Sequence, residues 1–168
     1  MIDAAGFRQF MARRAESIGL RLIKTGHYTA AETLLRKCLA IRRKELPWRV
    51  LLGGIDLEET RYESMLGEAI LKLGRTDEAE KILLRSATQL LHLGSISVGF
   101  SEVVLSIFMP ESKKGVEMVQ KNRQQLLRDT VERIVQLYQS TNRPEVAQEW
   151  LATRRLLEAT ASTQMEAK

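Results

Sequence analysis

The stretch LGEAILKLGRTDEAE, residues 66–80, sets a pattern that returns along the chain. Within it a glycine stands twelve positions before an alanine, Gly67 before Ala79. The same spacing joins two further pairs, with valine replacing glycine in the last: Gly19 with Ala31, and Val135 with Ala147. A unit repeated three times in 168 residues indicates a helical repeat array, because such units bury their apolar faces by stacking on one another.

Turn and cap residues divide each copy into two helices. Gly26 and Gly74 stand where a helix can end in the left-handed conformation, and Asn142 takes that place in the third copy. The segments 29–32 and 77–80 have capping-box spacing, so they predict helices that begin at Thr29 and Asp77. We therefore expect an all-α fold of three helical hairpins, at about residues 3–46, 56–93 and 116–159.

These hairpins should stack as a short right-handed superhelix within one domain, residues 1–160, followed by a flexible tail at 161–168. Two inserts separate the hairpins, at 47–55 and 94–115. Within the second insert, we expect 97–109 to be at least partly helical. This apolar stretch either folds back as a core helix or forms an interface for a partner or a second copy of the chain, through Phe100, Val104, Ile107 and Phe108.

The net charge of +5 is unevenly distributed, since ten basic and four acidic residues precede Pro47. A basic half of this kind suggests an anionic partner, and binding of nucleic acid or an anionic surface is one hypothesis for function. Basic residues late in a helix also complement its dipole, which is the alternative explanation. The cluster concerned comprises Arg36, Lys37, Arg42, Arg43, Lys44 and Arg49.

The sequence offers little for catalysis or metal binding. Cys38 is the single cysteine, and neither it nor His27 nor His92 has the spacing of a zinc ligand set. We predict that Cys38 packs in the core, and that the chain has no catalytic residues, no metal and no cofactor. The N-terminus does not read as a signal peptide, and no apolar stretch is long enough for a transmembrane helix, so we expect a cytoplasmic protein.

The segments 26–35 (GHYTAAETLL) and 66–80 resemble tetratricopeptide repeats, in particular the long-repeat variety of kinesin light chains. Segments 34–49, 132–138 and 142–145 also resemble the C-terminal repeat regions of large bacterial serine/threonine kinases. The kinase motifs themselves are absent, so this resemblance implies the scaffold without the enzyme. The chain would then be either an independent scaffold or the tail of a kinase-like protein.

In the family, glycine lets the paired helix approach closely, and the alanine twelve residues on is expected to be its small partner. Val135 breaks this rule and predicts a looser third hairpin. The bulky position four residues before the glycine, often aromatic in the family, is Ala15, Glu63 and Val131 here.

The resemblance implies a non-catalytic scaffold or adaptor that binds a peptide or partner protein on the concave face formed by the first helix of each hairpin. The alternative is that these residues form an ordinary solvated surface. The carboxylate clamp of some family members is not implied, because it needs lysine and asparagine where Glu16 and Leu20 stand. The residues expected on this face are Arg13, Glu16, Leu20, Lys24, Arg61, Ser64, Glu68, Lys72, Asp129, Glu132, Gln136 and Gln139.

Overall fold

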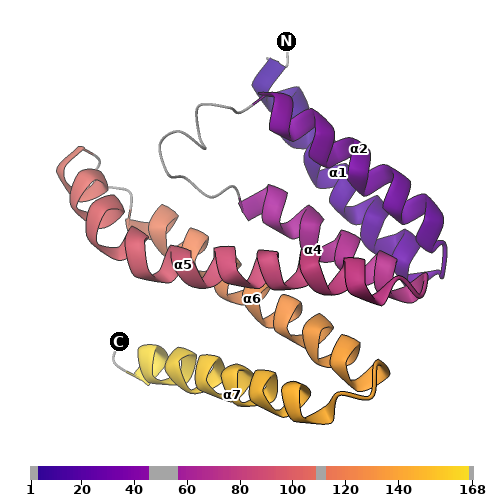
Figure 1. Ribbon diagram of the computed structural model, residues 1–168. Coiled ribbons are helices and arrows are strands. Elements are labelled where there is room, and N and C mark those ends of the chain that lie inside the picture. The colour runs from indigo at the N-terminus through magenta and orange to yellow at the C-terminus, as the bar shows by residue number, and fades with distance from the viewer. Residues whose placement is uncertain (1–3, 46–56, 109–112, 167–168) are drawn as a thin grey trace. The chain divides into compact units, whose positions relative to one another are not determined.

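The structure is a computed structural model that describes the backbone of residues 4–45, 57–108 and 113–166. Side chains are described for residues 14–44, 57–92, 118, 120–156 and 159. The described backbone is helical apart from three short turns, and it contains no strand (Figure 1). Its helices are α1 (Ala4–Lys24), α2 (Tyr28–Glu45), α4 (Leu57–Lys72), α5 (Thr76–Phe108), α6 (Lys113–Ser140) and α7 (Pro144–Glu166).

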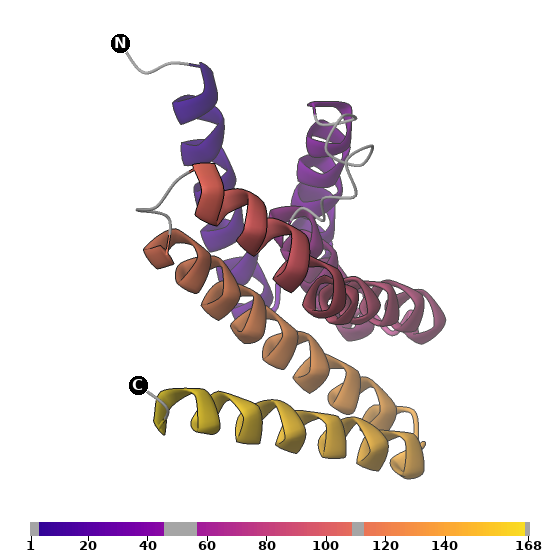
Figure 2. The same cartoon turned by 90° about the vertical axis from the view of Figure 1, so that its left-hand side faces the viewer.

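The predicted all-α fold is confirmed, and the helices pair in sequence as hairpins α1–α2, α4–α5 and α6–α7. The chain divides into two compact units, residues 1–83 and 84–168, with the boundary inside α5. In the first unit, α4 contacts both α1 and α2. In the second, α6 and α7 lie side by side (Figure 2). The right-handed superhelical stacking of all three hairpins stays a prediction.

The three turns share one hydrogen-bonded geometry. In the first, the N–H of Gly26 donates to the carbonyl of Ile23 at 3.1 Å, and the N–H of His27 donates to Leu22 at 2.8 Å. These two bonds form a Schellman motif, which needs a left-handed residue after the helix. The predicted caps are confirmed, with φ of 79° at Gly26, 81° at Gly74 and 55° at Asn142. The matching bonds join Gly74 to Leu71, Arg75 to Ile70, Asn142 to Gln139 and Arg143 to Tyr138.

Helices α2 and α5 each begin one residue earlier in the sequence than predicted. Helix α2 begins at Tyr28, because the carbonyl of His27 already accepts a hydrogen bond from the N–H of Ala31 at 3.0 Å. Helix α5 begins at Thr76 for the same reason, with Arg75 accepting from Ala79 at 3.1 Å. Thr29 and Asp77 therefore lie inside their helices and are not N-caps.

Helix α5 is longer than the sequence pattern indicated. It continues to Phe108 through most of the stretch that we expected to be an insert, so the helical prediction for 97–109 holds as far as that residue. Gly94 and Gly99 lie within this helix and do not end it. A glycine in a helix interior costs only about 1 kcal/mol relative to alanine, which an otherwise favourable helical segment tolerates. Helix α7 likewise extends to Glu166, into the expected tail. The first insert, 47–55, lies outside the described residues.

Two glycines allow close helix packing in the first unit, although their partners are not the expected alanines. A Cβ atom on Gly67 would lie 2.7 Å from both Cγ and Cδ2 of Leu83. One on Gly19 would lie 2.9 Å from Cε of Met65 and 3.4 Å from Cδ2 of Leu35. Gly67 thus makes room for the leucine sixteen positions later in the sequence, whereas Gly19 makes room for Met65 and is in ordinary contact with Leu35.

The third hairpin has Val135 and Leu151 at the corresponding positions. Leu151 is half-buried, whereas Leu35 and Leu83 have no exposed surface. This difference is in the direction expected if the larger Val135 separates the two helices. The core of this unit nonetheless includes a continuous stripe from α6, made by Leu126, Leu127, Val131, Ile134, Val135, Leu137 and Tyr138.

Candidate functional site

An open depression of about 530 Å³ runs along the exposed side of α1. It brings together three residues predicted for the binding face, Glu16, Leu20 and Lys24, because residues four apart share one side of a helix. The complete lining is Glu16, Ser17, Leu20, Arg21, Lys24 and Thr25. The side chain of Arg13, also predicted for this face, lies outside the described residues.

The charges in this depression are not balanced. Glu16 is engaged by Arg61 of α4, whose Nη1 donates to Oε1 at 2.7 Å. Arg21 and Lys24 are exposed, and no side-chain partner holds either of them within the described part of the chain. Leu20 is half-buried and adds apolar surface. The depression therefore presents two cationic groups beside an aliphatic side chain.

The residues predicted from α4 are less uniformly exposed. Lys72 is exposed and Glu68 is half-buried, while Arg61 is held by its ion pair with Glu16. Ser64 departs from the expectation, since its side chain has no exposed surface. Helix α4 is the central helix of its unit and buries nine of its 16 residues, so fewer of its positions remain open than on α1.

The residues predicted from α6 belong to the second unit and are exposed or half-buried there. Asp129 accepts a hydrogen bond from Nε2 of Gln125 at 2.8 Å. Glu132 pairs with Arg154 of α7 at 2.5 Å, and Gln136 and Gln139 are exposed. The predicted apolar interface residues Phe100, Val104, Ile107 and Phe108 lie on the helical backbone of α5, and their side chains are outside the described residues.

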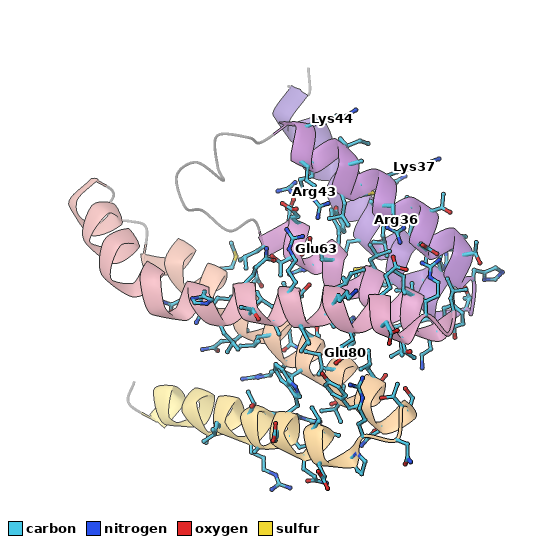
Figure 3. The ribbon with its side chains drawn as sticks, viewed as in Figure 1. Arg36, Lys37, Arg43, Lys44, Glu63 and Glu80 are labelled. Carbon is cyan, nitrogen blue, oxygen red and sulfur yellow. The ribbon has the colours of Figure 1, made fainter. Side chains whose placement is uncertain are left out.

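An ion-pair ladder between the first two hairpins is the main feature that the sequence reading missed. Arg43 of α2 donates to Glu59 at 2.7 Å and to Glu63 at 2.6 Å, both on α4. Arg42 pairs with Glu58 at 2.5 Å. Figure 3 shows Arg43 directed towards α4, where Glu63 lies. The ladder accounts for two of the basic residues of the first hairpin, Arg42 and Arg43, because carboxylates of the second hairpin neutralise them.

Four other charged groups, nearer the hairpin turns, form a closed ring of ion pairs. Arg36 pairs with Glu32 at 2.9 Å and with Glu78 at 2.5 Å. Arg75 pairs with the same two carboxylates, at 2.5 Å and 3.1 Å respectively. The hydrogen bond from Arg75 is the largest influence that lowers the pKa of Glu32, and the bond to Glu32 leads those that raise the pKa of Arg36. The ring therefore stabilises Glu32 and Arg36 in their charged forms.

In a comparison with known families, residues 11–47 match the tetratricopeptide repeat model. The first hairpin is therefore similar to a tetratricopeptide repeat. The match covers most of α1 and all of α2, and thus the whole lined depression. Neither the search of curated proteins nor that of solved structures found a match. Repeats of this family in general mediate protein–protein interactions.

The basic cluster of the first hairpin is largely paired with the second hairpin. Arg36, Arg42 and Arg43 of the basic cluster are all held by carboxylates. Lys37 and Lys44 are exposed and point away from the hairpin (Figure 3). Arg49 lies outside the described residues. The ion pairs remove most of the support for a nucleic-acid surface in this cluster, since paired arginines are less available to phosphates.

Cys38 of α2 is half-buried, and burial raises the pKa of its thiol. Burial also raises the pKa of Tyr62 to about 12. Both groups are therefore neutral at physiological pH, in keeping with packing roles. Within the described residues, no three His, Cys, Asp or Glu side chains form a group that could hold a metal ion. None of the helices searched in that same part of the chain is long and apolar enough to span a membrane.

The charge ring predicts how stability depends on pH. Because the pKa of Glu32 is lowered in the folded state from its ordinary value of 4.5, its charged form stabilises the fold above that pH, and this contribution is lost as pH falls through the folded pKa. The free energy of unfolding of the wild type should exceed that of Glu32→Gln near neutral pH, and the difference should shrink below about pH 4. Urea unfolding at a series of pH values measures it.

Glu149→Gln, at an exposed position of α7, is the control for loss of a surface charge. It should change the free energy of unfolding little at any pH. A difference between wild type and Glu32→Gln that stays constant down to pH 2 would contradict the role assigned to the ring.

Proposed function

We propose that this chain is a non-catalytic protein-interaction scaffold that binds a peptide or an extended segment of a partner protein on the open side of the first helix of its hairpins. The depression on α1 carries the proposal. It lies within the segment that matches the tetratricopeptide repeat model, it is open to solvent, and it contains three of the residues expected on the binding face.

The proposed face continues beyond α1. On α4 it includes Lys72 and the half-buried Glu68, whereas the buried Ser64 is no longer assigned to it. In the second unit the exposed row on α6, with Gln136 and Gln139, is the corresponding surface. Each unit thus offers polar side chains on the first helix of a hairpin, where an extended peptide can form hydrogen bonds along its length.

Several finer expectations belong to this proposal. They are an adaptor role in the cytoplasm of a bacterial cell, the absence of catalytic activity and cofactors, and self-association through 96–109. The long-repeat subtype and the relationship to kinase tails also remain predictions, supported by the sequence segments in which they were recognised.

The position of the site is tested by filling it without changing charge. Ser17 is exposed and lines the depression, so Ser17→Trp should obstruct any ligand there. We expect peptides selected from an unbiased displayed library against the wild-type protein to lose most of their binding to Ser17→Trp, by about tenfold or more, since one steric clash costs more than 1 kcal/mol. Fluorescence anisotropy with the selected peptides measures this.

Ala40→Trp is the matched control, because Ala40 is exposed on α2 and does not line the depression. Circular dichroism establishes that both variants fold. A library that yields no binding peptide, or peptides that bind wild type and Ser17→Trp equally, would refute the proposed site.

A further inference from the structure

We infer that the α1 depression selects acidic peptides, with carboxylate side chains on either side of an aliphatic residue. This inference rests on the proposed function, and it adds the chemical class of the ligand. Its starting point is that the acidic group of the depression already has an ion-pair partner, whereas its two basic groups have none within the described part of the chain.

The only carboxylate of the lining, Glu16, is committed to Arg61 at 2.7 Å. It therefore adds little negative potential towards solvent. Arg21 and Lys24 are exposed, and within the described part of the chain neither is engaged by another side chain. The local field at the opening is positive, which attracts carboxylates and opposes a basic peptide.

The spacing of these groups also matters. Leu20 precedes Arg21 directly and lies one helical turn before Lys24, so an apolar contact and two cations share one stretch of α1. A ligand that complements this stretch places an aliphatic side chain on Leu20 and acidic side chains near the two cations. The aliphatic contact gives affinity by burial, and the charges select the ligand and steer its approach.

A nucleic acid would also be attracted by the positive field, but the lining does not favour it. None of the six lining residues is aromatic, whereas single-stranded nucleic acids are usually bound by stacking of bases on aromatic side chains. The aliphatic Leu20 offers a base no such platform. An acidic peptide therefore satisfies more of the groups present than a phosphate backbone does.

The test uses three fluorescein-labelled dodecapeptides that differ only in charge. The first has glutamates on both sides of a central leucine, the second has glutamine in place of every glutamate, and the third has lysine. With the full chain in 50 mM salt, we expect the acidic peptide to bind at least about tenfold more tightly than the glutamine peptide, and the lysine peptide not to bind. Raising the salt to 0.5 M should remove most of this preference, because exposed charges are then screened.

Two double variants locate the effect. Arg21→Glu with Lys24→Glu should weaken binding of the acidic peptide by about tenfold, which corresponds to about 1.4 kcal/mol. Lys37→Glu with Lys44→Glu makes the same change in net charge on the outer side of α2, and it should leave binding within about twofold. Thermal unfolding shows whether each variant is folded.

Three outcomes would overturn the inference. They are equal binding of the three peptides, equal losses in the two double variants, and binding of a thymidine 20-mer, but not of the acidic peptide, through Arg21 and Lys24. If the displayed library instead yields neutral or basic peptides that are blocked by Ser17→Trp, the proposed site stands and the ligand class assigned to it is wrong.

Discussion

Replacing Arg43 by glutamate is expected to destabilise the protein by about 2 kcal/mol, between the values typical of exposed and buried ion pairs. Arg43 is half-exposed, but its partner Glu63 retains only 4% of its side-chain surface. The variant would remove the charge that compensates this buried carboxylate and place another carboxylate beside it. Urea unfolding of the two proteins measures the difference.

The neighbouring residue provides the matched control. Lys44 is exposed and has no ion-pair partner in the described structure, so Lys44→Glu should change the free energy of unfolding by less than about 0.5 kcal/mol. In the Arg43→Glu background, adding Glu63→Gln should restore part of the lost stability, because it removes one of the repelling charges. Equal destabilisation by Arg43→Glu and Lys44→Glu would show that the ladder adds nothing beyond net charge.

Alanine at Gly67 should also destabilise the protein, by up to about 2 kcal/mol. A Cβ atom there would lie 2.7 Å from the branch point of Leu83, so α4 and α5 must separate or Leu83 must change rotamer. Overpacking of this kind costs about 1 to 3 kcal/mol, while the better helix propensity of alanine returns about 1 kcal/mol. Thermal or urea unfolding measures the net effect.

Gly19→Ala makes the same chemical change in the first hairpin, where we expect a different result. The nearest atom to its new Cβ would be Cε of Met65, at the end of a flexible side chain that can move. This variant should be about as stable as the wild type or slightly more so. A Gly67→Ala protein as stable as Gly19→Ala would contradict the packing described for α4 and α5.

Local features of the fold were predictable because their causes are local. A left-handed residue at a helix end requires glycine or asparagine, so Gly26, Gly74 and Asn142 could be assigned from sequence alone. The starts of α2 and α5 were missed by one residue, because Thr29 and Asp77 resemble N-caps, whereas the hydrogen bonding of the turn had already begun the helix.

Features that depend on the register between helices were not predictable in this way. Acidic residues at the start of α4 are already explained by their favourable interaction with the helix dipole. The sequence therefore gives no sign that one of them, Glu59, pairs with Arg43 of another helix. The burial of Ser64 could not be predicted either, because it depends on how many helices pack around α4. For the candidate site, helical periodicity placed Glu16, Leu20 and Lys24 together, but it gave no sign that Glu16 is neutralised by Arg61.

The ion-pair ladder also means that the first two hairpins are not interchangeable modules. Arginines lie on the side of the first hairpin that faces α4, and carboxylates lie on the matching side of the second. A chain with these two hairpins in reversed order, or with the first hairpin duplicated, would bring surfaces together that lack this match. The charges therefore encode the order of the hairpins, and recombining them with other repeats would require redesign of the ladder at each new junction.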